Sequence, residues 1–173
     1  LKYENDRSLT PKERATVLAW IAQGAPRGDA SKEPPAKQYR EGWSIAAPGD
    51  SIHVVEIPKP NVVPAEGTVN YIRMRVPTNF KEDMWVQAAE AVPGERSVVH
   101  HIIVFVDDHS GGGRGQGIRH LCGYAPGDMP SVYPKGIAKK IPAGSDFIFE
   151  LHYTPDGKVR TDRSKVGLVF AKK

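Results

Sequence analysis

The sequence predicts an all-β protein, an antiparallel β-sandwich of jelly-roll-like type with one N-terminal α-helix. Short runs rich in β-branched residues recur along the chain and are typical of strands. Between these runs lie most of the 15 prolines and 17 glycines, which favour turns. Because a chain of 173 residues can bury one medium-sized core, we expect one sandwich domain with a short appendage rather than two full domains.

The appendage begins with a helix near the N-terminus. Residues 10–13, Thr-Pro-Lys-Glu, combine a capping-box pattern with proline at the first helical position. Gly24 ends the helix and Pro26 follows it. The apolar residues between these signals recur at helical spacing: Ala15, Leu18, Ile21 and Ala22. Because a single helix cannot bury its own apolar face, we expect it to dock on the main domain or to belong to a neighbouring domain.

Three segments are expected. Residues 1–27 form the helical tail, and residues 28–49 form a linker rich in proline, lysine and glutamate. Trp43 is the one large apolar anchor in that linker, so we expect it to pin the linker onto the sandwich. Residues 50–173 form the sandwich itself.

The sandwich is expected to contain seven or eight short strands. Residues 93–96, Pro-Gly-Glu-Arg, form a turn, and so short a connection predicts that the strands on either side are antiparallel neighbours. Residues 58–67 are expected to be a proline-rich loop, and residues 122–127 to be turns. The clearest strand patterns lie at 52–57, 68–76, 84–92, 97–106, 147–153 and 164–170.

Composition argues against several function classes. The net charge is +4, but the lysines and arginines are scattered and no basic run is interleaved with aromatic residues, so nucleic-acid binding is not predicted. The glycine-rich stretch 107–115 lacks the ending and the following helix of a phosphate-binding loop. Cys122 is the only cysteine, which excludes an internal disulfide framework. No stretch is apolar enough to span a membrane.

Two adjacent histidines, His100 and His101, lie in the most apolar strand. Neighbouring residues of a strand point to opposite faces, so this pair puts a polar ring on each face of a core strand. Burying polar rings in this way costs free energy unless they find a partner. A shared metal ion would offset that cost if the strand twists or bulges there. The best third ligand is His152, which shares a strand face with Ile148 and Glu150. The alternative is that the pair marks a solvated strand end.

A three-histidine site without a thiolate suits copper or zinc, since calcium and magnesium prefer oxygen ligands. The other histidines are expected to be structural or solvated. His53 alternates with polar residues in its strand, and His109 and His120 flank the glycine-rich loop.

An ordered set of motifs between Trp43 and Phe170 resembles a known family. The motifs are Val-Val-His-His-Ile-Ile-Val-Phe at 98–105, Gly-Tyr-Ala-Pro-Gly at 123–127, Ile-Pro-Ala-Gly at 141–144, Glu-Leu-His-Tyr at 150–153, and Asp-Arg-Ser-x-Val-Gly-Leu at 162–168. Together they resemble the first half of the copper type II, ascorbate-dependent monooxygenases, which include peptidylglycine α-hydroxylating and dopamine β-monooxygenases. The helix and its exit resemble the end of a bacterial cytochrome c domain, which precedes this module in bacterial relatives of the family.

The resemblance implies a ligand set and a role. In that family the first of two sandwich domains binds one copper through a His-His pair and a histidine in a His-Tyr strand, which here correspond to His100, His101 and His152. That copper passes electrons to a second copper, held elsewhere by a His-x-His motif and a methionine. This sequence has no His-x-His motif. We therefore expect one copper per chain, no haem, no catalytic residue and no hydroxylation by this chain alone.

The chain is thus expected to be at most half of a copper monooxygenase, its electron-transfer domain. Because it begins with Leu1, we expect it to be a processed or trimmed part of a longer protein. The implied partners are a second copper domain and an upstream cytochrome c domain of the same parent protein, in the periplasm or outside the cell. Two alternatives remain: a copper-binding redox module without a hydroxylase role, and a structural or docking subunit of a larger extracytoplasmic assembly with an empty or non-catalytic site.

Overall fold

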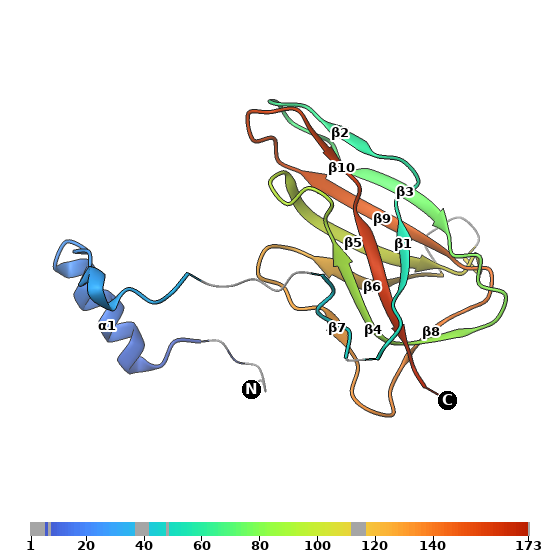
Figure 1. Cartoon of the computed structure of the whole chain (residues 1–173), viewed down its shortest axis with the longest axis horizontal. Helices are drawn as coiled ribbons and strands as arrows, with labels where there is room; N and C mark the ends of the chain where they lie inside the picture. Colours follow the sequence, from blue (N-terminus) through green and yellow to red (C-terminus); the bar gives the residue numbers. More distant parts are fainter. Residues whose placement is uncertain (1–5, 7, 37–41, 48, 112–116, 173) are drawn as a thin grey trace. The chain divides into compact units, whose positions relative to one another are not determined.

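The computed structural model describes residues 6, 8–36, 42–47, 49–111 and 117–172. The chain divides into two compact units, 1–39 and 40–173. The first unit contains α1 (Pro11–Ala22) and a short 3₁₀ turn, η1 (Ala30–Lys32). The strands of the second unit (Figure 1) are β1 (His53–Glu56), β2 (Asn61–Val63), β3 (Ile72–Pro77), β4 (Met84–Val92), β5 (Val99–Asp107), β6 (Ile118–Tyr124), β7 (Ser131–Val132), β8 (Lys139–Ile141), β9 (Asp146–Tyr153), β10 (Arg160–Asp162) and β11 (Lys165–Phe170).

The helix α1 forms as its capping signals predict. The Thr10 hydroxyl accepts a hydrogen bond from the Glu13 backbone N–H at 3.3 Å, and the Glu13 carboxylate accepts one from the Thr10 backbone N–H at 2.8 Å. Gly24, with φ of +80°, follows the end of the helix. No residue of α1 is buried, so its apolar side chains are not covered within the described part of this unit. Among the described residues, no helix combines the length and the apolar character needed to cross a membrane.

Two antiparallel sheets make up the second unit, and the predicted all-β sandwich is confirmed. One sheet has the order β1-β11-β4-β7, with β8 also paired to β4, and the other has the order β3-β9-β5-β6. The strands β2 and β10 form a separate antiparallel pair. Residues along β9 alternate between buried and half-buried, so one side of this strand faces the core. The buried core includes Phe147, Phe149 and Leu151 of β9 together with Val86 and Leu168 of the opposite sheet.

One predicted pairing is wrong. The strands β4 and β5 are not neighbours, because β4 pairs with β11, β7 and β8, whereas β5 pairs with β6 and β9 in the other sheet. Six residues, 93–98, connect the two strands, and Val98 among them is almost fully buried. The connection therefore leads from one sheet to the other instead of closing a hairpin.

Several short strands lie where loops or turns were expected. The strand β2 lies within the predicted loop 58–67, and β6 takes up part of the predicted turns at 122–127. The glycine-rich stretch 107–115 falls partly outside the described residues, which omit 112–116. The count of strands is therefore higher than the seven or eight expected.

The end of the predicted linker packs on the sandwich. A side-chain carbon at Gly167 of β11 would lie 2.7 Å from the Trp43 ring, so the indole sits directly against the glycine backbone. The Lys165 ammonium lies 5.5 Å from the centroid of the same ring. The Glu90 carboxylate accepts hydrogen bonds from the backbone N–H and the hydroxyl of Ser44 at 2.6 and 2.8 Å. These contacts confirm that Trp43 pins this segment, and they explain why the second unit begins before residue 50.

Candidate metal centre

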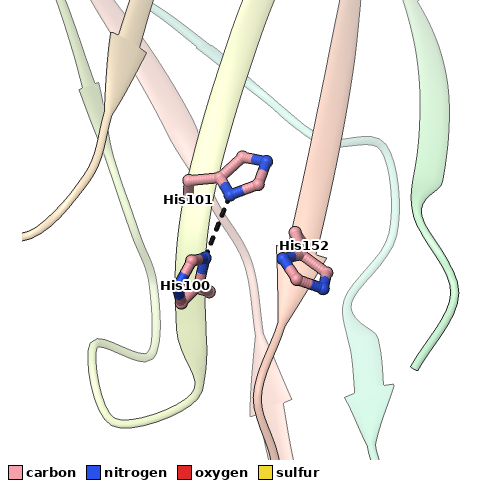
Figure 2. Close-up of side chains that lie close together, drawn as sticks. All are labelled: His100, His101 and His152. Carbon is pink, nitrogen blue, oxygen red and sulfur yellow. Dashed lines mark hydrogen bonds between the residues drawn. The ribbon is translucent and has the colours of Figure 1, made fainter. Parts of the chain in front are cut away.

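A β-bulge brings the two adjacent histidines to one side of the sheet. In the β5–β9 pairing Val99 lies opposite Tyr153 and His101 lies opposite His152, so His100 is the extra residue on β5. A bulge of this kind lets two consecutive side chains leave the strand in similar directions. The rings of His100 and His101 therefore lie beside the ring of His152, as Figure 2 shows. The bulge that the histidine pair required is present.

The three predicted ligands form a compact cluster. Nδ1 of His100 and Nδ1 of His101 are 3.1 Å apart. The ring centroids of the three histidines are 5.4, 5.1 and 5.0 Å apart. Each ring offers one nitrogen, and these nitrogens all lie within 4.8 Å of one another. The cluster can hold a metal ion.

The donor atoms suit such an ion. Nδ1 of His152 is buried and has no hydrogen-bond partner in the described part of the chain, at a cost of about 1–3 kcal/mol that a bound metal would remove. Metal–imidazole bonds are about 2.0–2.1 Å long, so two nitrogens on one ion are at most about 4.2 Å apart. The 3.1 Å pair already meets this limit. The 4.8 Å within which all three nitrogens lie exceeds this limit by about 0.6 Å, a gap that a small side-chain adjustment closes.

The surroundings of the cluster favour the neutral form of His101. His100 is exposed, whereas His101 and His152 are half-buried. Burial lowers the pKa of His101, and the neighbouring rings of His152 and His100 lower it further, while the Glu150 carboxylate acts in the opposite direction. A neutral imidazole is the form that binds metal, so His101 is ready to act as a ligand at neutral pH.

Tyr71 forms one wall of the centre. Its ring stacks on the His152 ring with centroids 4.5 Å apart and planes inclined by 2°, and it lies 5.5 Å from the His101 ring. Tyr71 remains 57% exposed. The stack covers one face of His152 and holds its orientation. Sequence reasoning did not select Tyr71, because its closeness to His152 follows only from the antiparallel pairing of β3 with β9.

The other three histidines, expected to be structural or solvated, lie elsewhere. The His53 ring is exposed and packs 5.3 Å from the Phe80 ring. Nε2 of His109 lies 3.5 Å from a carboxylate oxygen of Asp146. His120 belongs to the strand β6 rather than to a loop, with its ring 6.2 Å from the Phe105 ring. None of the three belongs to the histidine cluster.

No family model matches the sequence, and no curated protein matches it.

Metal affinity is expected to depend on pH. The nitrogens must be deprotonated to bind, and the lowered pKa of His101 keeps this ligand neutral to a lower pH than an ordinary histidine. Zn(II) affinity should therefore change little between pH 8 and 7, and it should fall below about pH 6, as protons compete with the metal for the imidazole nitrogens. Calorimetric titration with Zn(II) from pH 8 to pH 5 measures this dependence. A pH-independent affinity across this range would contradict binding through imidazoles.

Proposed function

We propose that residues 40–173 form a mononuclear copper-binding, electron-transfer module of the copper monooxygenase type. The observation that carries the proposal is the convergence of His100, His101 and His152 across a bulge, with one nitrogen from each within 4.8 Å of the others. Three imidazoles from two strands are a built ligand set, because the fold itself holds them together before any ion binds.

The donor set supports copper and a redox role. The cluster contains three imidazole nitrogen donors and no thiolate or carboxylate, which suits copper or zinc. When bound, copper would supply one-electron chemistry, alternating between Cu(I) and Cu(II). Exposed His100 gives an electron donor or acceptor access to one side of the centre.

One copper at this cluster would suit electron transfer better than complete hydroxylation. Among the described residues, His100, His101 and His152 are the one group of three or more His, Cys, Asp or Glu side chains close enough to hold an ion. A single copper delivers one electron at a time, whereas hydroxylation of a C–H bond by oxygen consumes two. The module would therefore serve a second copper domain, with an upstream cytochrome c domain as a further partner in the same extracytoplasmic protein.

Copper loading and redox cycling test the proposal. We expect the purified chain to retain one copper after gel filtration and to show a Cu(II) electron paramagnetic resonance signal that ascorbate removes and ferricyanide restores. The variant His53→Ala, which changes a histidine outside the cluster, should behave like the wild type. If the loaded protein retains neither copper nor zinc, the copper proposal is wrong and the structural or docking role is favoured.

A further inference from the structure

An ion pair lies in the row of the sheet next to the metal centre. The β3–β9 pairing sets Arg73 opposite Glu150, and the β5–β9 pairing sets Ile103 on the other side of Glu150. Glu150 precedes His152 by two residues, so both lie on the same face of β9, with backbones about 7 Å apart. The carboxylate therefore belongs to the same outer surface as the three histidines without being one of them.

The two charges of this pair differ in their exposure to solvent. Arg73 Nε donates a hydrogen bond to Glu150 Oε2 at 2.6 Å, and a terminal nitrogen of Arg73 contacts the same oxygen. The Glu150 side chain is 12% exposed, whereas that of Arg73 is 72% exposed. Water screens the guanidinium more strongly than the carboxylate. At the centre, the negative charge of Glu150 thus outweighs the positive charge of Arg73, in keeping with the influence of Glu150 on His101.

We propose that Glu150 sets the preference of the centre for Cu(II) over Cu(I), and that Arg73 limits this preference. The inference rests on the proposed function and extends it. A nearby carboxylate attracts a dication more strongly than a monocation, so Glu150 stabilises the oxidised centre. Glu150 is not a ligand but acts through the field around the ligands.

The variants Glu150→Gln and Arg73→Gln test the inference, with Cu(I) and Cu(II) affinities measured by chelator competition. Glu150→Gln should weaken Cu(II) binding about tenfold and Cu(I) binding about threefold, because the electrostatic energy scales with the charge of the ion. The threefold change in their ratio corresponds to a reduction potential higher by about 30 mV. Arg73→Gln should shift the ratio in the opposite direction by a smaller factor, since its charge is largely screened.

A matched control is available in the opposite sheet. Glu56 of β1 pairs with Arg163 at 3.2 Å, and Glu56→Gln should leave the Cu(II)/Cu(I) ratio unchanged. Zn(II), a redox-inert dication, should follow Cu(II) in losing affinity on Glu150→Gln. If Glu150 were only structural, Glu150→Gln would weaken the binding of Cu(I) and of Cu(II) by the same factor. Arg73→Gln would then not shift the Cu(II)/Cu(I) affinity ratio in the opposite direction. That result would overturn this inference and leave the proposed function standing. A wild-type protein that binds no copper would overturn the proposed function and this inference with it.

Discussion

His152→Ala is expected to abolish stoichiometric copper binding. His152 is the one cluster member from β9, and its removal leaves two adjacent rings of the same strand. Loss of groups that merely orient metal ligands costs about 10–100-fold in affinity, so loss of a ligand should cost more than about 100-fold. Copper per chain, measured by elemental analysis after gel filtration, should fall from one to near zero. Full-strength binding by this variant would contradict the shared site.

Thermal unfolding distinguishes an effect of His152→Ala on folding from an effect on metal affinity. Copper at 100 times its dissociation constant should stabilise the wild type by about 2.7 kcal/mol, which raises its melting temperature. His152→Ala should fold but show no such rise at the same copper concentration. The variant His120→Ala, which changes an exposed histidine of β6 in the same sheet, should keep both the copper and the rise.

The histidine cluster could be predicted because two adjacent polar rings in an apolar strand are unfavourable, and this is visible in the sequence. A polar pair inside an apolar β-branched run needs an explanation. One explanation is a bulge that turns both rings toward one shared ion, and the structure has a bulge between Val99 and His101. The helix α1 and the strand β4 were predicted with their observed bounds or nearly so, because capping residues and long apolar patterns are local signals. The pairing of β5 with β9 is not local, and only the structure shows that it brings His152 to the pair.

Irregular pairing explains why β6 was missed. In the β5–β6 ladder Val104 lies opposite Cys122 and Phe105 lies opposite His120, so Leu121 is the extra residue of a bulge. Leu121 and Cys122 are consecutive and both buried, which breaks the period-two pattern that identifies a strand. The short strands β2, β7, β8 and β10, of two or three residues each, offer no period to detect.

Sequence reasoning also assigned no role to Asp162, although it lies in a quoted motif. The pattern Asp-x-Ser before a strand is a turn signal, because the carboxylate can accept hydrogen bonds from the residue two positions on. In the structure Asp162 is fully buried, and it accepts hydrogen bonds from Ser164 N–H and hydroxyl groups at 3.2 and 2.8 Å. It also accepts from the backbone N–H groups of Gly94 and Glu95, both at 2.9 Å, and from the Tyr153 hydroxyl at 2.9 Å.

Asp162→Ala is therefore expected to lower the free energy of unfolding by about 3–5 kcal/mol, because five donors, three of them in buried hydrogen bonds, lose their acceptor. Urea denaturation should show a lower midpoint with an unchanged slope. Tyr153→Phe, which removes one of the five donors, should cost about 1 kcal/mol. Asp128→Ala, at an exposed loop aspartate, should change stability by less than about 0.5 kcal/mol. If Asp162→Ala lowered the free energy of unfolding by no more than Asp128→Ala does, the Asp162 network would not be needed for stability.

The network also supports the metal centre. Asp162 accepts a hydrogen bond from the connection that enters β5. It also accepts one from Tyr153, which lies opposite Val99 at the edge of the bulge. Asp162→Asn keeps the shape of the side chain but replaces one accepting oxygen with a donor, so it should loosen this flank while the chain still folds. Because the bulge sets where the rings of His100 and His101 meet His152, the variant should bind copper more weakly than Asp128→Ala under conditions in which both are folded. Equal copper affinity in the two variants would mean that the bulge holds its shape without the buried carboxylate.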